Sequence, residues 1–320
     1  MVESLPSKQM TRVRIPVRAL DENPIKIKNK MDTQKIENWY NKNYKKLLVL
    51  PLLMMIFSFG YLVYFYQTNN DFIYKDISLT GGTFATLTGN IDAEKLVNEL
   101  SDKLEDINTR EIYDLLTHER KALLIETKSN IETTKQVLEE YMGYELNSDN
   151  SSFEFTGSTL STNFYKQLLI AILIAFIFMA LVVFIIFRTF VPSSAVIISA
   201  FADILMTLVL ADILQIKMST AGIVAFLMLI GYSVDTDILL TTRVLKRKDG
   251  TINQRIFGAF KTGITMTMTS ILTMALALII VMSFSIVLTQ IFTVLLIGLG
   301  FDLINTWITN VSILKWYAEK

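Results

Sequence analysis

The sequence contains no cysteine, which excludes disulfide bonds, thiol catalysis and cysteine-ligated metal sites. The sequence has a single histidine, His118, so a histidine-rich metal site is excluded as well. Because His118 lies in a polar segment, it is expected to be a surface residue. Proline is scarce, with five residues among 320. No metal, cofactor or catalytic side chain is predicted.

Apolar residues are abundant instead. They make up 52% of the chain, compared with an apolar share of about 45–50% in soluble domains. The mean hydropathy is +0.43. Six stretches are long and apolar enough to cross a bilayer as helices. They are Leu47–Tyr66, Gln167–Phe187, Val191–Leu214, Met218–Arg243, Gly263–Met282 and Val287–Trp316. The chain is therefore predicted to be an α-helical integral membrane protein, with a first span in residues 47–67 and a five-helix bundle in residues 166–316.

The charges are distributed unevenly. Residues 1–46 hold eleven Lys or Arg against five Asp or Glu, whereas residues 68–165 hold eight against eighteen. A positive flank before a first membrane helix explains the basic arm without nucleic acid, so no nucleic-acid partner is predicted. The positive-inside rule places residues 1–46 and 317–320 in the cytoplasm of a cell-membrane protein and residues 68–165 outside.

Residues 68–165 have the composition of a small soluble domain. The predicted order is a strand at Asp76–Leu87, a helix at Asp92–Asp106, strands near Thr109–Leu116 and Lys121–Thr127, a helix at Ile131–Tyr141 and a strand near Ser152–Phe155. This is the βαββαβ order of a ferredoxin-like α+β domain. Gly81, Gly82 and Thr83 interrupt the first strand, which indicates either a bend or a close approach of another backbone.

Acidic residues inside apolar spans carry the functional signal. Asp203 and Asp302 lie near the middle of their spans, and Asp235 and Asp237 lie in the fourth. Because no Lys or Arg lies deep in a span, some of these carboxyl groups should hold a proton or bind a cation. The alternative is that Asp203 and Asp302 are structural acids, bonded to Ser, Thr or Asn305, that never titrate.

Asp235 and Asp237 point about 200° apart on a regular helix, so only one can face a given neighbour. Asp235 lies four residues after Gly231, which would admit a close helix, and we expect Asp235 to face inward. Asp237 is then expected to pair with Lys261 or Arg243, or to be hydrated. Lys261 can also reach a carboxylate of the fourth span. Threonines of the fifth span form a polar stripe, which either links helices or lines a water path.

The layout resembles SecF, the smaller partner of SecD in the SecD/SecF family of the RND superfamily. Two segments carry the resemblance: Thr80-Gly-Gly-Thr83 is similar to the family's GGT motif, and Leu229–Arg243 is similar to its fourth-helix motif. Within the fourth-helix motif, the residues Ser233-Val-Asp-Thr-Asp237 most resemble the archaeal members of the family. The resemblance implies half of an RND-type transporter body, in which a large external domain follows the first helix.

It further implies an accessory role in protein export. With SecD, such a protein draws a translocating polypeptide from a SecYEG-type channel across the lipid bilayer, coupled to proton or sodium flow. The ion-coupling position corresponds to Asp235 or Asp237, and Lys261 corresponds to a basic residue of the fifth helix. The hypothesis is that protonation of Asp235 changes the packing of the fourth helix on the fifth and tilts the external domain.

Two alternative hypotheses for the function remain open from the sequence. One is an RND-like exporter of lipids or small molecules, which would also need a partner half. The other is an intramembrane aspartyl protease that uses Asp235 and Asp302, which requires the two carboxyl groups to share a proton. Its Gly-x-Gly-Asp signature is absent, since Gly298-Leu-Gly-Phe-Asp302 has one extra residue.

Overall fold

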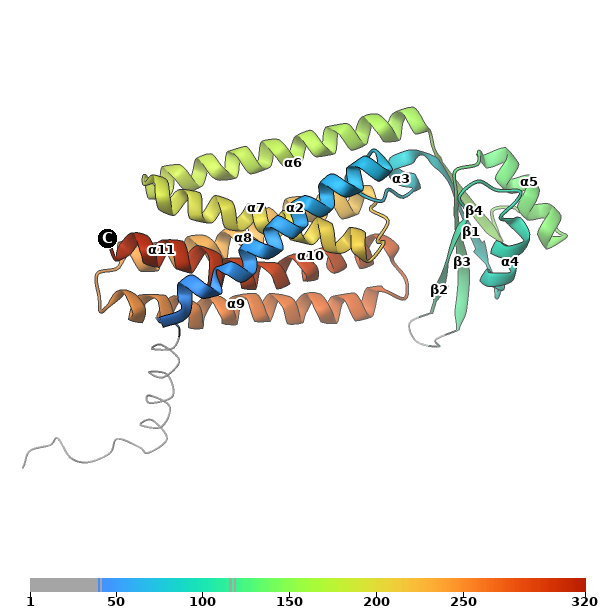
Figure 1. Ribbon diagram of the computed structural model, residues 1–320. Helices are drawn as coiled ribbons and strands as arrows, with labels where there is room; N and C mark the ends of the chain where they lie inside the picture. Colours follow the sequence, from blue (N-terminus) through green and yellow to red (C-terminus); the bar gives the residue numbers. More distant parts are fainter. Residues whose placement is uncertain (1–39, 41, 115–116, 118) are drawn as a thin grey trace, which may run out of the picture. The chain divides into compact units, whose positions relative to one another are not determined.

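The structure is a computed structural model that describes residue 40 and residues 42–114, 117 and 119–320. Most of the basic arm predicted for residues 1–46 lies outside these residues, and so does His118. Within the described part, the chain forms a bundle of membrane-length helices and a small sheet domain inserted between the first two (Figure 1).

Among the described residues, six helices are long and apolar enough to span a membrane, which is the predicted number. They are Lys42–Asn69, of which α2 is Val49–Asn69, then α6 (Ser158–Phe187), α7 (Phe190–Ile213), α8 (Thr220–Lys246), α9 (Ile252–Val281) and the run Ile286–Ala318. The most apolar windows of α7 and α8 are 61% and 56% buried, compared with 6% for α6. The centre of the bundle is therefore made by α7 and α8, and α10 packs against both.

The last span is not the uninterrupted helix that its apolar pattern predicted. It divides into α10 (Ile286–Ile304), a π-helix η1 (Asn305–Asn310) and α11 (Val311–Ala318). Wide turns of this kind are rare and often lie at functional sites. Every polar side chain of η1 except that of Thr309 is buried, which marks this turn as part of the interior of the bundle.

The inserted domain contains β1 (Gly82–Thr88), α4 (Ala93–Leu100), β2 (Asn108–Tyr113), β3 (Arg120–Thr127), α5 (Ile131–Met142) and β4 (Ser151–Thr156). This is the predicted βαββαβ order. The sheet is antiparallel with strand order β2-β3-β1-β4. Alternate residues such as Ala85, Leu87, Leu123 and Ile125 pack with α4 and α5 in one core, which leaves the opposite face of the sheet without a covering helix.

Two predicted elements of this domain are shorter than expected. Residues 77–80, predicted as strand, form a helical turn, α3 (Ile77–Thr80), because the side chain of Asp76 accepts a hydrogen bond from the backbone N–H of Ser78 and caps it. The helix predicted for Asp92–Asp106 ends as α4 at Leu100, and Asp106 has a positive φ of 51° that no α-helix accommodates.

The two adjacent glycines are required by close backbone approach and not by a simple bend. Gly81 and Gly82 have φ values of +89° and +150°. A Cβ atom at Gly81 would lie 2.5 Å from the backbone of Ser158, and one at Gly82 would lie 2.4 Å from the carbonyl oxygen of Thr127. The motif therefore lets β1 begin against both β3 and the start of α6.

Backbone and side-chain bonds attach the sheet domain to the bundle. Met218 donates its N–H to Tyr74 and accepts from the N–H of Asp76, so the chain entering the sheet pairs with the α7–α8 loop. On another side, Tyr113 donates its N–H to the carbonyl of Ser283 in the α9–α10 loop at 3.0 Å. Lys217 reaches Asp106 at 3.3 Å.

Candidate functional site: a buried carboxyl cluster

Three carboxyl groups on three different helices meet inside the bundle. Asp203 of α7, Asp237 of α8 and Asp302 of α10 are each 0% exposed. A carboxylate in this position costs roughly 2.5–3.5 kcal/mol even on mild insertion scales, so its partners decide whether it is tolerated.

Asp203 has a hydrogen-bond donor for each carboxyl oxygen. The Ser233 hydroxyl donates to Oδ2 at 2.5 Å, and the Asn305 amide donates to Oδ1 at 2.7 Å. Ser233 comes from α8 and Asn305 from η1, so this carboxyl group joins three segments. Its acceptor capacity is well satisfied by neutral donors.

Asp237 accepts all of its hydrogen bonds at one oxygen. Asn310 Nδ2 lies 2.7 Å from its Oδ1, Thr306 Oγ1 lies 2.8 Å away and Ser199 Oγ lies 3.3 Å away. The other oxygen, Oδ2, is buried and has no hydrogen-bond partner within the described residues.

Asp302 shares a partner with Asp237. Thr306 Oγ1 lies 3.0 Å from Asp302 Oδ1, while Asp302 Oδ2 is buried without a partner in the described part of the chain. One threonine hydroxyl thus bridges two carboxyl groups. The widened turn of η1 places Thr306 between α8 and α10 to make this bridge.

Positive charge does not compensate the cluster. No ion pair among the described residues involves Asp203, Asp237 or Asp302, and all their hydrogen-bond donors are neutral Ser, Thr or Asn side chains. Three mutually close carboxylates would repel one another in a low-dielectric interior, where each charge is also poorly solvated. The arrangement suits groups of which at least one is neutral.

The prediction that Asp235 faces inward is wrong. Asp235 and Gly231 are both exposed, and nothing lies within 4 Å of a Cβ atom built at Gly231. Asp237 is the inward group, since the two positions point to opposite sides of α8. The aspartyl-protease pairing fails with it, because Asp302 is buried while Asp235 is on the outside of the bundle.

Asp237 does not pair with Lys261 or Arg243, the partners expected from the sequence. Arg243 donates from Nη1 to the carbonyl of Gly258 at 2.7 Å and so ties the ends of α8 and α9 together. Lys261 is exposed and forms no ion pair with a described carboxylate. Three hydroxyls of the threonine stripe, at Thr265, Thr269 and Thr273, donate to carbonyls of α9 itself and link no neighbouring helix.

Sequence reasoning missed most of the donors around the cluster. Asp302, Thr306 and Asn310 follow one another at intervals of four, and so do Ser233 and Asp237. Residues spaced by four share a helix face, so a neutral polar residue four positions from a membrane aspartate is the signal that could have found them.

Taken together, the fold and this cluster define a multi-pass membrane protein of six helices with ionisable groups held inside the bundle, the kind of site that marks an ion or proton path. Residues 135–320 match the family model described as protein export membrane protein SecD/SecF, C-terminal. SecF of Methanocaldococcus jannaschii is 40% identical over 284 residues, covering 87% of this chain and 97% of that protein. SecF of Methanothermobacter thermautotrophicus is also 40% identical, covering 87% and 94%. The chain therefore belongs to the SecD/SecF family, as a SecF.

The fold is also found in a solved structure. The crystal structure of SecDF from Thermus thermophilus, a translocon-associated membrane protein, aligns with a TM-score of 0.68 at 18% identity. The match covers 86% of this chain but only 38% of that one. This chain thus corresponds in fold to a part of the longer SecDF chain. It is a multi-pass membrane protein of SecF, which is an accessory family of protein export.

Proposed function

We propose that this SecF acts with SecD to help a polypeptide leave a SecYEG-type channel, and that a proton passing between Asp302 and Asp237 through Thr306 couples this work to the gradient across the membrane. In this scheme the sheet domain engages the polypeptide outside the membrane, and the carboxyl cluster converts proton movement into a change of helix packing.

The observation that carries the proposal is the position of the Thr306 hydroxyl. It lies 2.8 Å from one oxygen of Asp237 and 3.0 Å from one oxygen of Asp302. A hydroxyl has one proton to donate. Both contacts are hydrogen bonds only if one carboxyl group is protonated and donates to Thr306, which in turn donates to the other.

The distribution of donors supports Asp237 as the ionised partner. Its Oδ1 also receives Ser199 and Asn310, whereas Asp302 Oδ1 receives Thr306 and Asp302 Oδ2 has no geometric hydrogen-bond donor within the described residues. Donors stabilise the charged form of a carboxyl group. A proton then rests on Asp302, and passing it through Thr306 moves the charge from Asp237 to Asp302.

Asp203 supplies a link from this step to helix packing. Ser233 lies one turn from Asp237 on α8, and Asn305 precedes Thr306 in η1, and both bind Asp203. A change of charge at Asp237 or Asp302 therefore acts on segments that α7 also holds. Each proton that crosses supplies about 2.3 kcal/mol per 100 mV, enough to shift an equilibrium between two packings.

Asp235 and Lys261 have a separate proposed role on the open side of α8 and α9, where a partner's helices can cover them. The 38% coverage of the SecDF chain supports a partner that supplies the rest of such a body. SecD is the partner that fits. Polar side chains from the membrane helices of SecD would complete a second site around Asp235.

We further propose that the sheet domain lies outside the cell and both termini in the cytoplasm. The acidic composition of residues 68–165 and the basic α8–α9 loop support this orientation. Because the chain has no cysteine, a single cysteine introduced at Ser152 or at Asp249 can be labelled alone. An impermeant maleimide added to intact cells should label the first and not the second, and the opposite result would reverse the orientation.

The test of the relay is the pair Thr306→Val and Thr306→Ser. Valine keeps the shape but removes the hydroxyl, so Thr306→Val should lower gradient-driven export about as far as absence of the protein. Serine keeps the hydroxyl and should retain most of the activity. Export of a preprotein from energised membrane vesicles gives the readout, and the level of inserted protein is the control. Equal export by the two variants would contradict the relay.

A further inference from the structure

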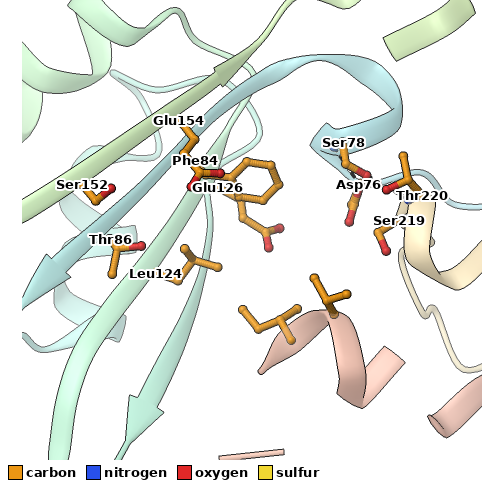
Figure 2. Close-up of a pocket in the computed structure, with 12 residues that line it drawn as sticks. Asp76, Ser78, Phe84, Thr86, Leu124, Glu126, Ser152, Glu154, Ser219 and Thr220 are labelled. Atoms are coloured by element: carbon orange, nitrogen blue, oxygen red, sulfur yellow. Dashed lines mark hydrogen bonds between the residues drawn. The ribbon is translucent and has the colours of Figure 1, made fainter. Parts of the chain in front are cut away.

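A cavity of about 290 Å³ lies between the uncovered face of the sheet and the nearby ends of α8 and α10 (Figure 2). The sheet contributes Phe84, Glu126 and Glu154, the turn before β1 contributes Asp76, and the start of α10 contributes Ile286 and Val287. This volume is at the lower limit of ligand pockets, roughly 300 Å³, and so suits one long side chain and not a large ligand.

The strand register explains the lining. Glu126 of β3 and Glu154 of β4 both stand opposite Phe84 of β1, so the three form one row across the sheet. Side chains of one row point to the same face. Two carboxylates therefore flank an aromatic ring on the side of the sheet that α4 and α5 leave open.

The cavity holds excess negative charge. Asp76, Glu126 and Glu154 line it, and no basic side chain of the described residues does. The nearest counter-charge to Glu126, which is 3% exposed, is Arg110, whose Nε lies 3.9 Å from one carboxylate oxygen. A buried carboxylate at that distance from a cation is only partly compensated.

Asp76 is a second buried carboxyl group in the cavity whose charge is only partly stabilised. It is 8% exposed, and both bonds from Ser78 go to its Oδ1, so its Oδ2 has no hydrogen bond within the described residues. Burial raises the pKa of Asp76 to about 6, and the charge of Glu126 adds to this while Arg110 opposes it. A cation in the cavity would relieve both the lost solvation and the repulsion.

An organic cation fits better than a metal ion. Among the described residues, no three acidic or histidine side chains converge closely enough to hold a metal. The walls also include Phe84, Leu124, Ile286 and Val287, which suit the methylene groups of lysine or arginine. A ring at the floor of the cavity adds a cation–π surface.

The groove continues past this cavity along the same face of the sheet. Thr86 lines it and also lines a second hollow of about 760 Å³ with Tyr113, Lys121 and Phe284. An extended chain that follows this face can therefore contact both hollows through Thr86, whereas a free amine held in the cavity would leave the second hollow empty.

We propose that this groove binds an extended polypeptide segment and that the cavity takes one of its lysine or arginine side chains, whose positive charge is attracted by the carboxylates of Asp76, Glu126 and Glu154 that line the walls. This rests on the proposed function, since a translocating polypeptide is the extended chain that such a protein would meet. The site gives the sheet domain a preference for basic residues.

The probe is a short unstructured peptide of Gly, Ser and Thr with capped ends, one central lysine and a fluorescent label. The full chain in lipid nanodiscs should bind it about tenfold more tightly than the same peptide with glutamine, by fluorescence anisotropy at low salt. Butylamine should compete weakly. Equal binding of the two peptides overturns the proposal, and butylamine that binds as tightly as the peptide overturns its polypeptide part.

Three variants locate the site. Glu126→Gln and Asp76→Asn should each reduce the lysine preference, while Glu145→Gln, an exposed residue of the α5–β4 connection, makes the same charge change and should leave it intact. Retained preference in both cavity variants overturns the proposal. The two-peptide comparison on the unaltered protein stays decisive even if a variant fails to fold. Export with and without the protein is measured separately. If the unaltered protein shows no lysine preference but export still depends on it, only this inference fails, whereas export that does not need the protein contradicts the proposed function.

Discussion

At the scale of single residues, the cluster shows how a membrane protein holds several acids in one place. Ser, Thr and Asn donors, and no cation, surround Asp203 and Asp237 in the described structure. Neutral donors stabilise a charge without cancelling it, so proton movement still changes the net charge of the site. A buried lysine would have fixed the acids in the ionised form.

The carboxyl group of Asp76 makes a prediction about pH and stability. Its pKa is raised to about 6 by burial, so between about pH 4 and 6 the folded chain holds a proton that the unfolded chain has lost. Stability should fall as pH rises through this range and stay lower above it, by at most about 1.4 kcal/mol per unit of pKa difference. Asp76→Asn keeps the cap on α3 and should remove this drop.

The measurement is thermal unfolding followed by circular dichroism from pH 4 to 7, an interval set by the ordinary pKa of aspartate at about 3.9 and the raised one. The variant should exceed the unaltered protein in Tm at pH 7 and match it near pH 4. Glu145→Gln, which removes an exposed charge from the same domain, should leave the pH dependence unchanged. Parallel curves for Asp76→Asn and the unaltered protein would contradict the assignment.

The choice between Asp235 and Asp237 shows where sequence reasoning stops at this scale. Helical geometry states that the two point apart, but not which faces the bundle. Gly231 by itself predicts a close helix, yet a close contact with α8 is made instead by Gly298, where a Cβ atom would lie 2.4 Å from Leu229. The interior side of α8 could be recognised only from its polar residues at intervals of four.

At the scale of elements, length and periodicity were sufficient for the six spans and for the βαββαβ order. They could not reveal η1, because a π-helix adds a residue to a turn without changing hydropathy. They could not find α3 either, since the cap on its four residues depends on one bond from Asp76. Local bonds of this kind decide short elements that pattern alone leaves open.

The start of β1 gives a prediction about one of these elements. Gly82→Ala would place a Cβ 2.4 Å from the carbonyl oxygen of Thr127 at a φ of +150°, so the β1–β3 pair must open there. A cost of about 1–3 kcal/mol is expected for a strained backbone position. Gly157→Ala is the matched control, because nothing lies within 4 Å of its Cβ and its φ is −69°.

Urea unfolding of the two variants, with limited proteolysis of the sheet domain, measures the difference. Gly82→Ala should unfold at lower urea and be cut faster between α3 and β3, while Gly157→Ala should resemble the unaltered protein. Equal midpoints for both would mean that the glycine pair is not needed for close packing.

At the scale of the whole molecule, the bundle has one side with the marks of an unfilled interface. Val224, Met228, Gly231 and Asp235 are all exposed on α8 and follow intervals of three and four, so they form one stripe. A small residue and an acid in such a stripe are unsuited to lipid but suited to a close polar helix. The exposed residues of α6 from Leu169 to Ile185, in contrast, are all apolar and suited to lipid.

This contrast predicts which side of the bundle is covered by SecD, the partner proposed above. A cysteine replacing Met228, which is 41% exposed, should react with a lipid-soluble maleimide in the isolated chain and several-fold more slowly in the complex with SecD. A cysteine replacing Leu173 on α6, 59% exposed, should react at the same rate in both. The absence of native cysteine makes each label specific. Protection at Leu173 and none at Met228 would place the partner on the α6 side of the bundle. Asp235 would then be an acidic side chain exposed to lipid, with no group of the described chain to stabilise its charge.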